Sequence, residues 1–484
     1  MEEIDIAAVK KRSIRGIFAL VSRTFIMQAI TFIANLLLTI FLSPQVFGVY
    51  FVVSAIIAFL TYFSDIGLAA ALIQKKEKIE EDDLKTTFTI QQALVITLVL
   101  LALIFSPKIG SFYNLDSDSL FLLQALVISF FLSSLKTIPS IILERNLHFE
   151  KLVIPQIIET LFFNIIAVVL AINGYGVSSF TYAVLARGLS GLITIYIISP
   201  WKIRLGYSKK SASKLLSFGV PFQLNSLLAL IKDDLLIVYL GKALPIAQVG
   251  YLGFAQKWAF LPLRLIMDNV IRITFPSFSR LQEDRGHLKI AVEKSIFAAC
   301  FIIFPCLAGM VILAPYLINI IPKYTKWEPA LLVLGLFSLN AMFAAVSTPL
   351  TNFLNATGKI KITLYLMIGW TIATWILTPL LIAVYGFSGA ALASAIIGPS
   401  GLIVVYIVKR QINVDVFGSI KNPLFSTILM SIFLYFISSI TVVNIFGLVF
   451  TAVLAAMLYF LSMVTLSKEQ LISNLKIIIN NLKK

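Results

Sequence analysis

The sequence predicts an all-α, polytopic membrane protein with about 14 transmembrane helices, organised as two related six-helix halves and two C-terminal helices. Three observations carry this prediction. The 484 residues are 59% hydrophobic and only 13% charged, whereas soluble proteins have about 25% charged residues. Apolar runs of about 20 residues, long enough to cross a bilayer as a helix, recur along the whole chain. A segment of the first half also returns in the second half.

The apolar runs place the transmembrane spans in order along the chain. We predict them at 17–42, 47–73, 86–106, 119–143, 152–172, 177–199, 216–240, 247–275, 294–321, 329–354, 361–384, 386–408, 422–440 and 443–466. The tail at 467–484 has leucines and isoleucines at helical spacing with lysines between them, which is typical of an amphipathic helix on a membrane surface. A solvated cytosolic tail is the alternative.

Basic residues indicate the orientation of these spans. One set of alternating loops, together with the termini, carries 28 Lys and Arg residues, against four in the other set. Loops rich in Lys and Arg stay on the cytoplasmic side, so we expect both termini in the cytoplasm and the protein in the cytoplasmic membrane. This topology also explains the net charge of +16, which therefore does not indicate a nucleic-acid partner.

A shift of 210 residues aligns Tyr175–Ile197 with Tyr385–Ile407, with 11 identities in 23 positions. Six predicted spans lie within this shift, so the two halves keep the same membrane orientation. We predict four parts: lobes at 1–205 and 206–412, two further helices within 413–466, and the tail 467–484. Parallel repeats are a transporter architecture with the substrate site between the halves. Chance similarity between helices rich in small residues is the alternative.

Polar residues follow one face of the first span. Thr24, Gln28, Thr31, Asn35 and Thr39 recur at steps of three or four, as in the wall of a polar cavity, although hydrogen bonds between helices would need the same pattern. Arg23 lies two turns into this span, where it either contacts a ligand or extends to the headgroups.

Charged residues also lie within spans 4 to 7. Glu159 and Arg187 are expected to neutralise each other within the first lobe, and Lys136 to extend to the membrane surface. In span 7 we expect Lys232 to pair with one of two neighbouring carboxylates, Asp233 and Asp234. The other is a candidate for binding a coupling proton or cation, unless it already reaches the outer interface.

Span 8 carries the most informative pattern. Lys257, Arg264, Asp268 and Arg272 are separated by seven, four and four residues, which places them on one helix face. Charges facing lipid are costly, so this face should look at water or at protein. Three cations against one anion favour an anionic ligand. We expect Arg264 and Arg272 to bind it, Lys257 to guide it, and Asp268 to position the guanidinium groups or to couple an ion.

Several enzyme signatures are missing from the sequence. It contains no phosphate-binding GxxxxGK[ST] loop, no nucleophile–base arrangement and no metal-ligand cluster. The two cysteines, Cys300 and Cys306, are six residues apart on different faces of one helix, which disfavours a disulfide. We therefore predict a protein that is not an enzyme and needs no cofactor or metal.

Several short segments together resemble the Wzx-type oligosaccharide flippases of the multidrug/oligosaccharidyl-lipid/polysaccharide exporter superfamily. They are Leu42–Tyr50, Phe63–Leu68, Ala71–Gln74, Val249–Tyr251, Ala255–Lys257, Ile273–Arg280 and Asn355–Lys359. The resemblance implies two six-helix lobes making a V around a cationic cavity, and a groove for a lipid tail at the last two helices.

The resemblance implies transport of a polyprenyl-pyrophosphate-linked oligosaccharide for cell-surface polysaccharide or lipopolysaccharide synthesis. The expected partners are this substrate, membrane lipid and a coupling proton or sodium ion, with the protein working as a monomer near glycan-assembly enzymes. Two alternatives stay open: a multidrug exporter of the same fold, and a membrane-embedded glycan polymerase or ligase.

Overall fold

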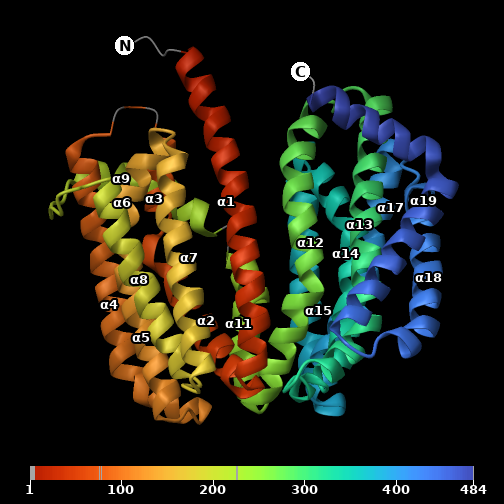
Figure 1. Cartoon of the computed structure of the whole chain (residues 1–484). Coiled ribbons are helices and arrows are strands. Elements are labelled where there is room, and N and C mark those ends of the chain that lie inside the picture. Colours follow the sequence, from red (N-terminus) through yellow and green to blue (C-terminus); the bar gives the residue numbers. More distant parts are fainter. Residues whose placement is uncertain (1–5, 76, 78, 225–226, 483–484) are drawn as a thin grey trace. The chain divides into compact units, whose positions relative to one another are not determined.

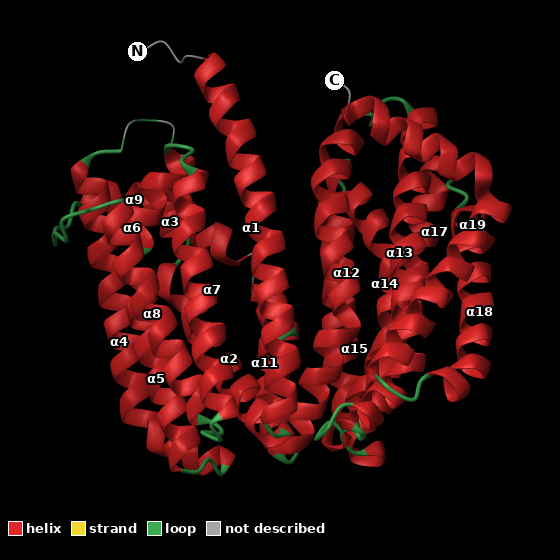
Figure 2. Cartoon of the chain, in the orientation of Figure 1, coloured by secondary structure: helices red, strands yellow, loops and turns green. Residues whose placement is uncertain are grey.

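The computed structural model describes residues 6–75, 77, 79–224 and 227–482, and all regular secondary structure within these residues is helical (Figures 1 and 2). The chain divides into two compact units, Met1–Gly250 and Tyr251–Lys484. Eleven helices of the described residues are long and apolar enough to cross a membrane. The protein is therefore an all-helical, polytopic membrane protein, as predicted from its composition.

The first unit begins with a long helix and contains three interrupted helix runs. Its helices are α1 (Ile6–Phe41), α2 (Pro44–Asp65), α3 (Leu68–Gln74), α4 (Glu81–Tyr113), α5 (Ser117–Ser134), α6 (Thr137–Arg145), α7 (Phe149–Ile172), α8 (Ser178–Ile198), α9 (Lys209–Leu224), α10 (Leu227–Lys232) and α11 (Asp234–Ala243). Figure 1 shows α7 between α1 and α8, and α7 packs against both of them.

The second unit contains the remaining helices, the first of which, α12, starts just before the boundary. They are α12 (Ile246–Arg280), α13 (Arg285–Ile320), η1 (Thr325–Trp327), α14 (Ala330–Ala356), α15 (Ile360–Tyr385), α16 (Ser388–Ile397), η2 (Gly398–Ser400), α17 (Gly401–Ile412), α18 (Val416–Thr441) and α19 (Ile445–Leu482). A core of α12, α13, α14 and α17 side chains holds the unit together, and α18 and α19 pack on α13.

Three predicted spans are not among these eleven helices, although α1 contains the shorter apolar helix Ile26–Phe41 within the described residues. They correspond to α1, to the interrupted run from α9 to α11, and to α12 with its charged residues. The helices α9 and α11, expected in the second lobe, pack on α3, α4 and α2 of the first unit. The compact units thus differ from the predicted lobes, whose pseudo-symmetry stays a prediction. The predicted tail is helical to Leu482 and continues α19 directly.

Local sequence explains where several helices begin. The Ser43 side chain caps α2 by accepting from the Val46 amide, and Pro44 occupies the first turn, where its missing N–H costs nothing. Asp284 caps α13 by accepting from the His287 amide at 3.1 Å. Gly176 and Gly386, equivalent at the shift of 210, both have positive φ, and α8 and α16 begin two residues later.

The run from α2 to α3 is interrupted where it crosses α9. Ile66 and Gly67 have left-handed φ angles of 47° and 73°, which few residues other than glycine adopt readily. The Asp65 carboxylate accepts from the Ala69 amide at 3.2 Å, which satisfies one free donor at the start of α3. A Cβ atom on Gly67 would overlap the backbone of Gly219, so the two helices cross with their backbones in contact.

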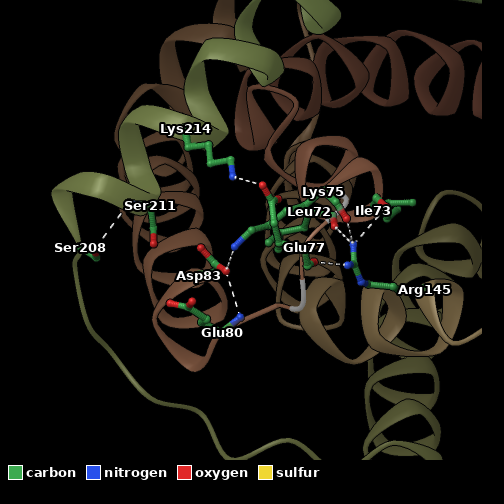
Figure 3. A network of polar contacts seen from close by, with 10 residues as sticks. All are labelled: Leu72, Ile73, Lys75, Glu77, Glu80, Asp83, Arg145, Ser208, Ser211 and Lys214. Atoms are coloured by element: carbon green, nitrogen blue, oxygen red, sulfur yellow. Dashed lines mark hydrogen bonds and ion pairs between the residues drawn. The ribbon is translucent and has the colours of Figure 1, made fainter. Parts of the chain in front are cut away.

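A polar network fixes the loop between α3 and α4 (Figure 3). Arg145 of α6 donates to the carbonyl oxygens of Leu72, Ile73, Lys75 and Glu77, at 2.8, 3.3, 2.6 and 2.5 Å respectively. These carbonyls lie at and beyond the end of α3, where helix carbonyls lack partners of their own. One guanidinium therefore holds the whole turn.

Two ion pairs shown in Figure 3 complete this network. Lys75 pairs with the buried carboxylate of Asp83 at the start of α4. Lys214 of α9 donates to Glu77 at 2.7 Å, with both side chains more than half exposed. The loop is thus joined to α4, α6 and α9 together.

Candidate functional site

The charged stripe of α12 lies outside the core of the second unit. Ala255, Ala259 and Met267 of α12 are at most 3% exposed, and Met267 packs in the core with α13 and α14. Lys257, Arg264, Asp268 and Arg272 are all exposed. The remaining surface of α12 between them is largely apolar, so the four charges form a polar strip on a membrane-length helix.

Asp268 does not pair with the arginines as we expected. Within the described ranges, no carboxylate lies within salt-bridge distance of Arg264 or Arg272, and Asp268 pairs with no basic group. Residues four apart on a helix are neighbours, but exposed pairs gain too little from pairing to hold two long side chains in place. A positioning role of Asp268 toward these guanidiniums therefore stays a prediction.

The polar stripe of α1 is partly satisfied by its own helix. Asn35 donates to the Thr31 carbonyl at 2.6 Å, and Thr39 donates to the Asn35 carbonyl at 2.8 Å. Gln28 is exposed. Arg23 donates to Oε1 of Gln156 on α7 at 2.5 Å, so its guanidinium faces protein rather than the headgroups. A ligand-binding role for Arg23, Gln28 and Asn35 stays a prediction.

A second group of charges lies inside the first unit. Glu159 of α7 accepts from Lys136 at 2.7 Å through Oε1, and its Oε2 lies 3.8 Å from Nε of Arg187 on α8. The predicted pairing of Glu159 with Arg187 is confirmed. The expectation that Lys136 extends to the membrane surface is wrong, because its ammonium group binds this carboxylate instead.

The helix break beside Lys136 has a clear cause. Pro139 has no N–H, so the Leu135 carbonyl loses the donor that a continuous helix would supply. The Tyr196 hydroxyl of α8 donates to that carbonyl at 3.1 Å instead. The break between α5 and α6 therefore lies at the Glu159 charge group, and α8 stabilises it.

The run from α9 to α11 carries the candidate coupling residues. Lys232 pairs with Asp233 at 3.2 Å, as we expected for one of the two carboxylates. Asp234 is the first residue of α11 and is only partly exposed, and a role of either carboxylate in ion coupling stays a prediction. No cluster of three or more metal-ligating side chains occurs within the described residues.

The spacing of residues gave no sign of an apolar cavity in the second unit, although the family resemblance implies a lipid-tail groove at the last two helices. This cavity of about 580 Å³ lies between α13, α18 and α19. Its lining includes Pro305, Gly309, Met430, Ala452 and Ala456. The exposed cysteine, Cys306, lies on it, whereas Cys300 is buried. Small residues facing larger ones leave this space between helices, and the lining is almost entirely apolar.

A family model described as "Polysaccharide biosynthesis protein" matches residues 37–331. The chain belongs to this family. Of the α1 stripe the match includes only Thr39; it also includes the Glu159 charge group and the α12 stripe, but not the cavity residues of α18 and α19.

Three curated relatives have names from succinoglycan, lipopolysaccharide and teichuronic acid biosynthesis. The chain is 24% identical over 315 residues to the succinoglycan biosynthesis transport protein ExoT of Rhizobium meliloti (strain 1021), covering 65% of this chain and 62% of ExoT. It is 25% identical to the lipopolysaccharide biosynthesis protein WzxC of Escherichia coli (strain K12), covering 65% and 64%. The teichuronic acid biosynthesis protein TuaB of Bacillus subtilis (strain 168) is 23% identical, covering 77% and 78%. The matches to ExoT and WzxC thus span just under two thirds of those proteins.

Solved structures establish the fold. The lipid II flippase MurJ in an inward closed conformation has a TM-score of 0.76 at 16% identity, covering 94% of this chain and 100% of that chain. An inward-facing multidrug resistance MATE transporter of the MOP superfamily has a TM-score of 0.60 at 16% identity, covering 81% and 99%. The chain therefore has the fold that MurJ and the MATE transporters share.

Proposed function

We propose that this protein transports a polyprenyl-pyrophosphate-linked oligosaccharide across the cytoplasmic membrane for cell-surface polysaccharide synthesis. The single observation that carries the proposal is the exposed stripe of Lys257, Arg264 and Arg272 on a membrane-length helix, with one carboxylate, Asp268, among three cations. The family and its relatives in succinoglycan, lipopolysaccharide and teichuronic acid synthesis supply the glycan part of the proposal.

The stripe suits a pyrophosphate for a physical reason. A guanidinium group donates two parallel hydrogen bonds to one phosphate, which an ammonium group cannot do. Arg264 and Arg272 lie two helical turns apart on α12, so they can contact the two phosphates of one pyrophosphate or one phosphate each in succession. Lys257, nearly two turns before Arg264, supplies a further cation along the same path.

An apolar tail needs a separate apolar surface. The cavity between α13, α18 and α19 provides one within the second unit, and we propose that the polyprenyl chain lies there. Its volume of about 580 Å³ accommodates a segment of a long polyprenyl chain rather than the entire chain. The remaining isoprene units would then lie in the surrounding bilayer lipid.

The remaining parts of the proposal concern the membrane topology and the ion binding that drives transport. We propose 14 spans with both termini in the cytoplasm, because α1, the run α9–α11 and α12 occupy the three predicted spans beyond the eleven apolar helices. Movement would be driven by proton or sodium binding at Asp233, Asp234 or Asp268. We expect a functional monomer that works beside glycan-assembly enzymes.

Two alternatives make different predictions. A multidrug exporter of the same fold would favour cationic drugs, which the cationic stripe of α12 repels. A glycan polymerase or ligase would need catalytic groups, whereas the family and its transport-protein relative support a transporter and not an enzyme.

A strain lacking only this protein separates these functions. If the protein is a lipid-linked oligosaccharide transporter, the completed precursor accumulates on the inner leaflet, where externally added glycosidases and lectins do not reach it. Short glycans exported to the cell surface would indicate a polymerase and contradict the proposal. Normal glycan export with altered drug resistance would indicate the multidrug exporter.

A further inference from the structure

The Glu159 charge group lies near the middle of two membrane-length helices, α7 and α8. Arg187 is the tenth residue of the 21-residue helix α8, and Glu159 is the eleventh of the 24 residues of α7. With a rise of 1.5 Å per residue, both are roughly 15 Å from the nearer end of their helix. An arginine side chain is too short to carry its charge from there to the headgroups.

The group has an unbalanced charge. Glu159 is the only carboxylate among the described residues that pairs with Lys136 or Arg187, so two cations share one anion. The contact to Arg187 is long, at 3.8 Å, and involves Nε alone. Arg187 is 53% exposed, against 15% for Lys136 and 13% for Glu159. Within the described residues, its two terminal nitrogens donate no hydrogen bond.

Arg187 does not belong to the apolar surface of α8. The exposed residues Tyr182, Leu189, Ile193 and Ile197 recur along one stripe of this helix. At 100° per residue, Arg187 lies about 120° around the helix from the centre of that stripe. Because a charge facing lipid near mid-membrane is strongly unfavourable, we expect the exposed guanidinium to face water.

Glu159 rests against the backbone of α8. A Cβ atom on Gly191 would overlap Oε1 of Glu159, so only glycine lets the carboxylate lie there. The break at Leu135, caused by Pro139, brings Lys136 to the same point. Interrupted helices near mid-membrane are a common way for transporters to build binding sites.

We propose that Arg187 and Lys136 form a binding site for an oxyanion of the transported molecule, a phosphate or a carboxylate, and that Glu159 occupies this site until the oxyanion displaces it. The inference rests on the proposed function for the identity of the molecule. Arg187 would bind the oxyanion through its two terminal nitrogens, which the Glu159 contact leaves available. Glu159 keeps the empty site neutralised and allows the ligand to leave, because it competes for the same cations.

The purified full-length protein tests this exchange with two probes, inorganic pyrophosphate and glucuronate, whose dissociation constants are measured by isothermal titration calorimetry. Glu159→Gln removes the competitor and should bind the preferred probe more tightly. Arg187→Gln should bind it about 10- to 100-fold more weakly. Arg187→Lys, which keeps the charge but loses the planar fork, should fall between wild type and Arg187→Gln. Stronger binding of pyrophosphate assigns the site to the lipid phosphates, and stronger binding of glucuronate assigns it to an acidic sugar.

Arg204→Gln is the matched control. Arg204 has the same exposed fraction, 53%, and pairs with one carboxylate, Glu81, at the end of α4 rather than at mid-membrane. Its replacement should leave both dissociation constants unchanged. Thermal unfolding gives a second measurement: Glu159→Gln should unfold at a lower temperature without ligand, and the preferred probe should raise that temperature more than it does for wild type.

The proposal is overturned if neither probe binds wild type or Glu159→Gln, or if Arg187→Gln binds as tightly as wild type. If the Glu159 group were only a structural ion pair, Glu159→Gln would bind the probes more weakly than wild type does. The probes would then raise its unfolding temperature no more than they raise that of wild type. These results are independent of the proposed function when every titration is done in the Arg264→Ala, Arg272→Ala background, because the α12 stripe then no longer binds pyrophosphate; glycan export in cells tests the α12 arginines separately.

Discussion

Replacing Arg145 with alanine should release the loop between α3 and α4. Of its four carbonyl partners, Leu72 and Lys75 form part-buried hydrogen bonds at 2.8 and 2.6 Å, and the bonds to Ile73 and Glu77 are exposed. Water replaces the exposed pair at little cost. Each part-buried bond to a charged donor is worth about 1.5 kcal/mol. The local opening free energy should therefore fall by about 3 kcal/mol, which is roughly a 100-fold change in the opening equilibrium.

Amide hydrogen exchange followed by mass spectrometry measures this opening directly. Peptides covering residues 72–83 should exchange roughly 100-fold faster in Arg145→Ala, while peptides of α7 and α13 keep their protection. Lys214→Ala is the control, since the Lys214–Glu77 pair is 57% and 60% exposed and exposed pairs contribute little. Exchange in 72–83 that rises less than about threefold in Arg145→Ala, or as much in Lys214→Ala, would refute this account of the loop.

Three further predictions concern topology, acid stability and the apolar cavity. A cysteine introduced at Ser111 should react with an impermeant thiol reagent from outside intact cells, and one at Ser208 should react only after permeabilisation; the reverse pattern would invert the topology. A hydrogen bond from Lys214 holds the pKa of Glu77 below its ordinary value, so the pair is fully formed above that ordinary value and is lost as the pH falls through the lowered pKa; because this exposed pair contributes little, Lys214→Ala should show the same rise in exchange of 72–83 below about pH 4 as wild type, after correction for intrinsic rates. Ala456→Trp should fill the cavity and reduce cross-linking by a photoreactive polyprenyl pyrophosphate, whereas tryptophan at the neighbouring exposed Met457 should not.

The sequence predicted the helical, membrane-spanning class because hydropathy and spacing depend only on local composition. It also predicted that Arg187 meets Glu159, because a buried carboxylate and a mid-membrane cation have few other ways to avoid lipid. It did not predict that Lys136 shares this carboxylate. The contact of Lys136 with Glu159 depends on the helix break caused by Pro139 and on the space beside Gly191. Both follow from the packing of α5, α7 and α8 rather than from the spacing of residues in the sequence.

The structure differs from the sequence prediction at two other places, and each difference also has a physical cause. A single span was predicted at 216–240, but α9, α10 and α11 divide it, and α9 crosses α3 with Gly219 against Gly67. Spacing on α12 placed Asp268 beside two arginines, yet exposed side chains gain too little from pairing to adopt that geometry. Residue spacing gave no signal for the cavity on α13, α18 and α19, because its lining resembles any lipid-facing helix; only the family resemblance implied a lipid-tail groove at the last two helices.

Transport by purified protein in liposomes tests the central claim most directly. A polyprenyl-pyrophosphate-linked oligosaccharide with a fluorescent sugar is placed in the inner leaflet, and its arrival outside is measured by quenching with an impermeant reductant. Wild type should accelerate this movement, and Arg264→Ala combined with Arg272→Ala should slow it at least about tenfold, because two charge-assisted bonds to the pyrophosphate are lost. Wild-type rates in the double variant, with equal protein insertion, would contradict the account.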